Sequence, residues 1–187
     1  MKNLKSIVIV LLVALGTTLS AQTKKIDVSK STITWLAKKI GGQHTGSVNL
    51  KEGNLIFKGT KIVGGSFIVD MTTVTATDLT GEYLDKLNGH LKSEDFFSTQ
   101  KFPNATLVFK KIAAKANGIY TITANLTIKG ITKPIIFDVN STANSATAIL
   151  IVDRTLYDIK YGSKSFFESI GDKAIDDEFE LKVALKF

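Results

Sequence analysis

The chain has 187 residues, a formal net charge of +7 and no cysteine. The lack of cysteine excludes disulfides, thiolate nucleophiles, cysteine-ligated metals and iron–sulfur clusters. All the basic residues except Arg154 are lysines, and they are scattered along the chain. On surfaces that bind nucleic acid, basic residues are usually clustered and are often arginines. We therefore expect no nucleic acid among the partners.

The N-terminus has the pattern of a secretory signal peptide. A basic start, Met1–Lys5, precedes the apolar run Ile7–Leu15, and mostly small residues follow as far as Ala21. The apolar run is much shorter than the roughly 20 residues that span a bilayer, which favours a cleaved leader over a retained anchor. We therefore predict a signal peptide over residues 1–21, one domain over 22–187, and a periplasmic or secreted location in bacteria.

Beyond the leader, apolar and polar residues alternate, which is typical of strands with one buried face. The C-terminal segment is the clearest example, because every second residue from Phe179 to Phe187 is apolar. Other runs rich in β-branched and aromatic residues predict strands over 32–40, 45–50, 54–57, 63–71, 106–112, 119–128, 131–141 and 146–159. The turn-forming pairs between them are Gly41-Gly42, Glu52-Gly53, Lys58-Gly59, Asn117-Gly118, Lys129-Gly130 and Ala143-Asn144.

One predicted helix interrupts the strands. In Glu82–Leu91, the leucines at 84, 87 and 91 recur at spacings of three and four residues, so they fall on one helical face. The position of this helix between strands fits a lid or plug over one end of a barrel. It fits equally well a helix that packs on the outside.

Many short strands at regular spacing indicate a sandwich or a barrel. Several of the runs are long, as in 119–128 and 146–159. Long strands can tilt and close on themselves, which leaves an interior lined by alternate side chains. We therefore predict an all-β fold, an eight-stranded antiparallel β-barrel with one short helix inserted mid-chain. Such a barrel has room for a packed core or for one slender ligand.

The sequence lacks the common motifs of catalysis and metal binding. The two histidines, His44 and His90, do not have the spacing of a zinc site, and there is no nucleophile elbow, phosphate-binding loop or dinucleotide fingerprint. We predict no catalytic residues, no metal, no cofactor and no enzymatic activity. Arg154, next to Asp153, can either clamp a phosphate or carboxylate head group or form an internal ion pair that fixes the barrel end.

Two segments resemble the signatures of the YceI-like family. Residues 88–109 read NGHLKSEDFFSTQKFPNATLVF, which is similar to that family's His-Leu-x-Ser-x-Asp-Phe-Phe…Pro…Ala-x-Phe pattern. Residues 126–134 read LTIKGITKP and resemble its Leu-Thr-x-x-Gly-x-Thr-x-Pro pattern. The segment Gly64–Asp70 and the pair Asp153-Arg154 match in order as well, and the similarity covers about residues 26–187.

This resemblance implies a lipocalin-like barrel that is exported to the periplasm or beyond. It also implies binding of polyisoprenoid lipids or related long-chain amphiphiles, since members of the family bind such ligands and are not established enzymes. It also implies that His90, Asp95, Phe96 and Phe97 fix the helix and the turn after it against the barrel. The family usually has an aromatic residue and a glycine shortly after the Asp-Arg pair. This chain has Tyr157-Asp158 there, so it departs from the family pattern at that turn.

The candidates for contact with such a ligand are inward residues of the alternating runs, with plain core packing as the alternative for each. They are Trp35, Phe67, Val69, Leu107, Phe109, Phe137, Leu150 and Val183. The polar candidates, for a head group or for a structural role, are His90, Asp95 and Arg154.

We therefore expect an exported protein that holds a polyisoprenoid or a similar long-chain lipid for transport, storage or sequestration. Transient membrane contact and a homodimer are compatible with the sequence. Two alternatives stay open. One is an enzyme that acts on an isoprenoid phosphate through His90, Asp95 or Arg154, and the other is a structural or stress-related envelope protein whose barrel is filled by side chains.

Overall fold

The computed structural model describes residues 20–167, 171 and 174–187. The basic start and the apolar run of the predicted signal peptide lie outside these residues. The strands are β1 (Ala21–Lys25), β2 (Thr32–Lys39), β3 (Gly42–Lys58), β4 (Lys61–Ala76), β5 (Asn104–Ala114), β6 (Ile119–Ile128), β7 (Ile131–Ser141), β8 (Ser145–Asp153) and β9 (Ile175–Lys186). The helices are α1 (Gly81–Lys92) and two short 3₁₀ turns, η1 (Val28–Lys30) and η2 (Arg154–Tyr157).

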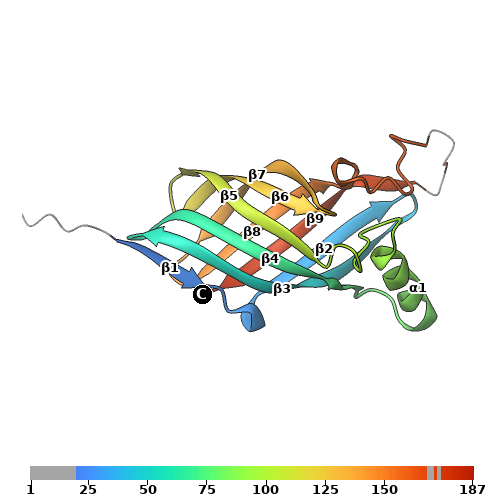
Figure 1. The fold of residues 1–187 in the computed structure, drawn as a ribbon, viewed down its shortest axis with the longest axis horizontal. Coiled ribbons are helices and arrows are strands. Elements are labelled where there is room, and N and C mark those ends of the chain that lie inside the picture. The colour runs from blue at the N-terminus through green and yellow to red at the C-terminus, as the bar shows by residue number, and fades with distance from the viewer. Residues whose placement is uncertain (1–19, 168–170, 172–173) are drawn as a thin grey trace, which may run out of the picture.

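The strands form one closed antiparallel sheet (Figure 1). Their order is β1-β3-β2-β9-β8-β7-β6-β5-β4, and a ladder between β3 and β4 closes the barrel. Strands β2 to β9 make the closed wall, and β1 pairs with the second half of the long strand β3. The prediction of an eight-stranded antiparallel, lipocalin-like barrel with one short helix is thus confirmed. The short strand β1 was not predicted.

Alternation sets which side chains enter the barrel. Strand β6 shows this over its whole length, because Tyr120, Ile122, Ala124, Leu126 and Ile128 are buried and the residues between them are not. These inward residues belong to one continuous hydrophobic core that includes residues from all of the strands β2 to β9. The interior of the barrel is therefore apolar along its length.

One predicted turn proves to be a bulge within a strand. Glu52 and Gly53 lie inside β3, whose ladder with β4 shifts register between Leu50 and Glu52 and then continues. A Cβ atom at Gly53 would lie 2.7 Å from a ring carbon of Phe67, so only glycine lets this ring pack against the strand. The predicted separation of residues 45–50 and 54–57 into two strands is therefore wrong.

The strand predicted over 146–159 is also too long. Strand β8 ends at Asp153, whose side chain accepts a hydrogen bond of 2.9 Å from the backbone N–H of Thr155 and so begins η2. This turn ends at Asp158 with a φ of +58°, in the left-handed region. Aspartate tolerates that region better than most residues, so it replaces the glycine usual in the family pattern.

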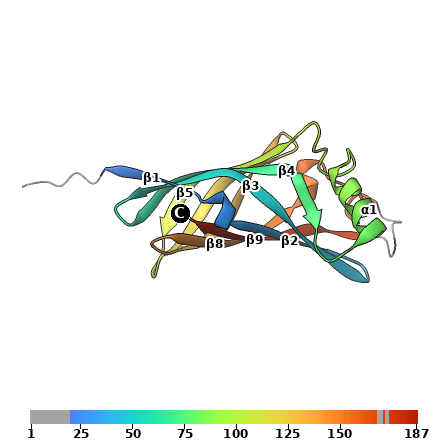
Figure 2. The ribbon, with the colours of Figure 1, turned by 90° about the horizontal axis from the view of Figure 1, so that it is seen from below.

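Helix α1 lies across one end of the barrel (Figures 1 and 2). Leu91 is buried, and Leu84 and Leu87 are partly buried against the core. Asn88 fixes the helix to β4, because its Oδ1 accepts a hydrogen bond of 2.9 Å from the backbone N–H of Ala76 and its Nδ2 donates one of 2.9 Å to Thr75 Oγ1. The helix therefore covers this end of the barrel, the position expected of a lid. Within the described ranges, no helix has the length and apolar character needed to cross a bilayer.

Candidate functional site

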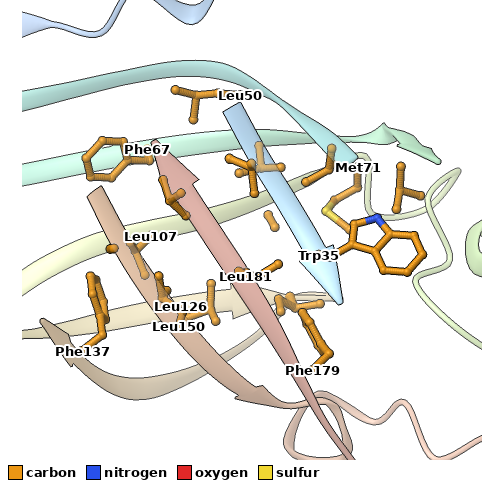
Figure 3. Close-up of a pocket in the computed structure, with 18 of the residues that line it drawn as sticks. Trp35, Leu50, Phe67, Met71, Leu107, Leu126, Phe137, Leu150, Phe179 and Leu181 are labelled. Carbon is orange, nitrogen blue, oxygen red and sulfur yellow. The ribbon is translucent and has the colours of Figure 1, made fainter. Parts of the chain in front are cut away.

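The barrel encloses a cavity of about 160 Å³ whose lining is almost entirely apolar (Figure 3). All eight of the residues proposed from alternation border it: Trp35, Phe67, Val69, Leu107, Phe109, Phe137, Leu150 and Val183. They come from β2, β4, β5, β7, β8 and β9, so the cavity exists only because the sheet closes. An apolar space of this kind is suited to an apolar ligand and offers few polar contacts.

Sequence reasoning missed other lining residues. They include Leu50, Met71, Leu126, Phe179 and Leu181, all labelled in Figure 3. A signal for two of them was present, because Phe179 and Leu181 share the alternating face of β9 with Val183. Alternation identifies the inward face of a strand, but it does not tell which inward residues border a cavity and which pack against one another.

Aromatic residues close the cavity at the end covered by α1. Phe96 and Phe97 follow the helix, are buried and line the cavity, with ring centroids 5.1 Å apart in an edge-to-face arrangement. Phe97 also meets Phe179 of β9, at 6.5 Å. The placement of Phe96 and Phe97 between helix and barrel agrees with the role that the family resemblance implied. At the opposite end, the rings of Phe57 and Phe187 lie 5.6 Å apart.

The polar candidates do not share one site. His90 lies on α1 between two aromatic rings, 4.3 Å from that of Tyr161 and 5.5 Å from that of Phe96, centroid to centroid. Its Nε2 is buried and has no hydrogen-bond partner among the described residues. Asp95 is exposed and is not part of the cavity lining. Of the three, only Arg154 borders the cavity.

Arg154 is only 2% exposed, and backbone carbonyls surround it. Its Nε donates to Asp176 O at 3.0 Å, and its Nη2 donates to Ile175 O at 3.0 Å. Its Nη1 donates to both Ile159 O and Tyr161 O, at 2.8 Å each. The guanidinium therefore joins the start of β9 to the segment after η2, and most of its donors are engaged within the protein.

The nearest carboxylate to Arg154 is Asp177, with 3.6 Å between Nη2 and Oδ1. Asp153, the neighbour in sequence, instead caps η2. Burial lowers the pKa of Arg154 below its ordinary value, and the charges of Asp177, Asp153 and Asp176 oppose this. The arginine fixes this end of the barrel, but through carbonyls and Asp177 and not through Asp153.

Asp177 completes this small network. Burial raises the pKa of its carboxyl, but contacts with Ser163 and Ser165 and the charge of Arg154 lower that pKa below its ordinary value. The charges of three carboxylates, those of Asp153, Asp176 and Asp177, thus act on one guanidinium. In the portion of the chain that the structure describes, no three histidine or carboxylate side chains come together as metal ligands would.

Substitution of Asn88 by alanine tests the lid. Loss of both hydrogen bonds leaves the Ala76 N–H without its partner, and we expect this to weaken the docking of α1 by about 1–2 kcal/mol. The amides of α1 should then exchange faster with deuterium, and a bound ligand should leave faster in stopped-flow experiments. The matched control is Asp85→Ala at an exposed position of the same helix. Unchanged exchange and release in Asn88→Ala would show that α1 does not gate the cavity.

A family model described as the YceI-like domain matches residues 25–187. A UPF0312 protein of Shewanella denitrificans is 37% identical over 90 residues, which are 48% of this chain and 45% of that protein. The chain thus spans about half the length of this curated relative.

Solved structures share the architecture. BcnA of Burkholderia cenocepacia superimposes with a TM-score of 0.65 at 22% identity, over 86% of this chain and 98% of that one. A polyisoprenoid-binding domain from Saccharophagus degradans, implicated in plant cell wall breakdown, gives a TM-score of 0.60 at 16% identity, over 90% of this chain and 97% of that one. At these identities the likeness concerns the fold. The match of the family model to residues 25–187 shows that the chain belongs to the YceI-like family.

Proposed function

We propose that this protein binds a polyisoprenoid or a similar long-chain amphiphile inside its barrel and carries, stores or sequesters it in the bacterial envelope. The observation that carries this proposal is the apolar cavity, which runs inside a closed barrel and is covered by α1. A polyisoprenoid-binding domain among the proteins with this fold supports the choice of ligand class. The signal-peptide pattern of residues 1–21 supports export to the periplasm or beyond.

The energetics of such binding are favourable. Burial of apolar surface contributes about 25 cal/mol per Å², so about 400 Å² of buried chain supplies about 10 kcal/mol before ordering costs. A micromolar Kd needs about 8 kcal/mol. Because association and ordering cost at least about 4 kcal/mol, micromolar affinity without a specific polar contact needs a chain that buries more than this area.

The size of the cavity bears on how a ligand would enter. An apolar cavity of about 150 Å³ holds benzene, and this one measures about 160 Å³. A chain of several isoprene units is much larger, so lining side chains must rotate or the lid must open as it enters. Met71, whose unbranched side chain adapts readily to new shapes, and Phe96 and Phe97 beside α1 are placed to do this.

Two experiments test the proposal. Protein purified from its native host is extracted with organic solvent, and mass spectrometry should find a long-chain amphiphile in stoichiometric amount. In titrations with such a lipid, the fluorescence of Trp35 should change, because it is the sole tryptophan of the chain and lines the cavity. No lipid in the extract and no fluorescence change would remove the basis for a carrier.

The cavity and the hydrogen bonds of Arg154 bear on the two alternative functions, a barrel filled by side chains and an enzyme. A barrel filled by side chains would have no such cavity. An enzyme acting on an isoprenoid phosphate needs free polar groups near the reacting atoms, whereas Arg154 is bonded to carbonyls and Asp95 lies outside the lining. Binding is therefore the better supported function. The enzyme hypothesis would be favoured again if the protein turned over an isoprenoid phosphate and His90→Ala abolished this turnover while fold and binding were retained.

We propose further that the α1 end contacts membranes. Tyr161, Phe166 and Phe167 are about half exposed, and Tyr161 lies against His90 of α1. Lys160 Nζ lies 5.1 Å from the centroid of the Phe166 ring, so cationic and aromatic groups combine as they do at lipid interfaces.

Vesicle binding tests this contact. The protein should sediment with vesicles of phosphatidylcholine and phosphatidylglycerol, and less with phosphatidylcholine alone, because lysine is attracted to anionic lipid. The double variant Phe166→Ser/Phe167→Ser should bind at least about 10-fold more weakly, since each buried phenyl contributes about 1.5–3 kcal/mol. Ile136→Ser, at an exposed apolar position of β7, should bind like the wild type. Equal binding by all three proteins would argue against this surface.

A further inference from the structure

The wall of the barrel is incomplete between β7 and β8. Their ladder contains only three pairs, next to the turn that joins the strands: Val139–Ala148, Asn140–Thr147 and Ser141–Ala146. Across this line, residues 131–138 of β7 and 149–153 of β8, all of them described by the structure, have no ladder partner. On their other sides, β7 pairs with β6 and β8 pairs with β9 along almost their entire lengths. We call this unpaired stretch the β7–β8 seam.

The seam borders the cavity. Continued in the same register, the ladder would pair Phe137 with Leu150, and both of these side chains line the cavity (Figure 3). Pro134 also lies in the unpaired stretch of β7, a type of position where a strand tolerates a residue without an N–H. A change in the distance between the two strands at the seam would therefore change the width of the cavity directly.

The turn η2 belongs with β8 and β9 more than with β7. It follows β8 directly, and its first residue, Arg154, donates hydrogen bonds to the carbonyls of Ile175 and Asp176 at the start of β9. Toward β7, η2 is in contact with the strand, and Lys129 Nζ, from the turn before β7, donates to Asp158 O at 3.2 Å. At this end the seam is thus closed by packing and by a lysine side chain.

The other short ladder of the closed wall is sealed more tightly. Strands β4 and β5 form five pairs, which end at Ser66–Val108. The next residues in that register are Gly65 and Phe109, and a Cβ atom at Gly65 would lie 2.9 Å from ring carbons of Phe109. The phenyl ring therefore packs directly on the neighbouring strand where the ladder ends, so the β7–β8 seam is the weaker line.

A long-chain ligand needs more room than the cavity offers. A cavity of about 150 Å³ holds benzene, and this one measures about 160 Å³. Rotation of the lining side chains redistributes this space but does not widen the barrel. Strand number and stagger fix the diameter of a barrel whose ladders are complete. The seam removes this constraint over part of the wall, and widening there breaks no ladder hydrogen bond.

From these observations we infer that β7 and β8 move apart along the seam when a long chain enters, and that this movement decides which chain lengths the protein accepts. The inference deepens the proposed function and depends on it. The lid is where the chain enters, and the seam makes room for it. Ile136 of β7 and Ile149 and Ile151 of β8 are exposed beside the seam, so a chain that shows in the widened wall meets apolar side chains as well as water.

Reversible linkers test the inference, because the chain has no cysteine of its own. In Ile136→Cys/Ile151→Cys, a short bis-methanethiosulfonate linker ties the two sides of the seam together. The matched control is Thr123→Cys/Ile136→Cys with the same linker, since Thr123 and Ile136 are already paired across the β6–β7 ladder. Calorimetry measures the affinity of each protein for 2-octanone and for 2-hexadecanone, both delivered from cyclodextrin.

The linked seam should select against the long chain. In the unlinked proteins the longer ketone should bind more tightly, by up to about 4-fold for each additional CH₂ group that is buried. With the seam linked, affinity for 2-hexadecanone should fall at least about 10-fold, whereas affinity for 2-octanone should stay within about 2-fold. Cleavage of the linker by a reductant should restore the affinity, and the control should bind both ketones equally well with and without its linker.

Spin labels on the same two cysteine pairs measure the movement itself. Electron–electron double resonance should show that the distance between labels at Ile136 and Ile151 increases with 2-hexadecanone, by up to about 5 Å, one inter-strand spacing. It should stay constant with 2-octanone. The distance between labels at Thr123 and Ile136 should stay constant with both ketones.

Three results would overturn the inference and leave the proposed function standing. They are undiminished affinity of the seam-linked protein for 2-hexadecanone, an equal loss of affinity in the linked control, and a constant distance across the seam when the long ketone binds. If the unlinked proteins bind neither ketone and the extract from the native host contains no lipid, the inference and the proposed function both fail.

Discussion

Replacement of Arg154 by methionine should lower the free energy of unfolding by about 3–5 kcal/mol, the range found when one partner of a buried charged network is removed. Methionine keeps much of the side-chain volume, so the loss comes mainly from hydrogen bonds. Four carbonyl oxygens, those of Ile159, Tyr161, Ile175 and Asp176, lose their donor. Urea unfolding followed by circular dichroism measures the change.

Lysine at this position should not restore stability. Its ammonium has three donors at a single point, whereas the carbonyls surround a planar fork with donors in several directions. Lys160→Ala is the control, because Lys160 is exposed and water screens its ion pair with Asp158. If Arg154→Met unfolds like the wild type but no longer binds hexadecyl phosphate, the arginine is a head-group clamp and the structural interpretation fails.

The strands could be predicted well because alternation is a local signal. Strands β6 and β7 begin and end at the residues expected from the sequence, since each is bounded by a turn with glycine or asparagine. The error at Glu52-Gly53 has a different origin. Glycine favours turns, but Gly53 is needed to make room for Phe67 on the neighbouring strand. That reason is a contact between strands, which a single stretch of sequence does not show.

The polar end of the cavity was harder to predict for the same reason. The residues that bind Arg154 lie between 5 and 22 positions further along the chain, and they meet only when β9 joins the barrel. Its neighbour Asp153 suggested an ion pair, although the Asp-x-Thr pattern at 153–155 is a local signal for the cap that the structure shows. The indole nitrogen of Trp35 has no hydrogen-bond partner among the residues that the structure describes. This could not be foreseen, because it depends on which acceptors the closed barrel leaves within reach.

Introduction of phenylalanine at Ala148 should abolish the binding of long-chain ligands. Ala148 lines the cavity from β8, where it lies opposite Val139 of β7 and Val183 of β9. A cavity of about 150 Å³ holds one benzene ring, so a phenyl group added here occupies most of the 160 Å³. We expect affinity for 2-hexadecanone to fall at least about 10-fold. The free energy of unfolding should change by less than about 1–3 kcal/mol, the usual cost of overpacking, because the new ring enters empty space.

The neighbouring position provides the control. Ile149 points outward from the same strand and is exposed, so Ile149→Phe adds a similar ring to the outer face and should bind ligand like the wild type. A folded Ala148→Phe protein that still binds the ketone with wild-type affinity would place the ligand outside the barrel. If both variants are equally stable and only Ala148→Phe loses binding, the ligand lies inside the barrel. The reason is that the added ring lies on the inner side of the wall in Ala148→Phe and on the outer side in Ile149→Phe.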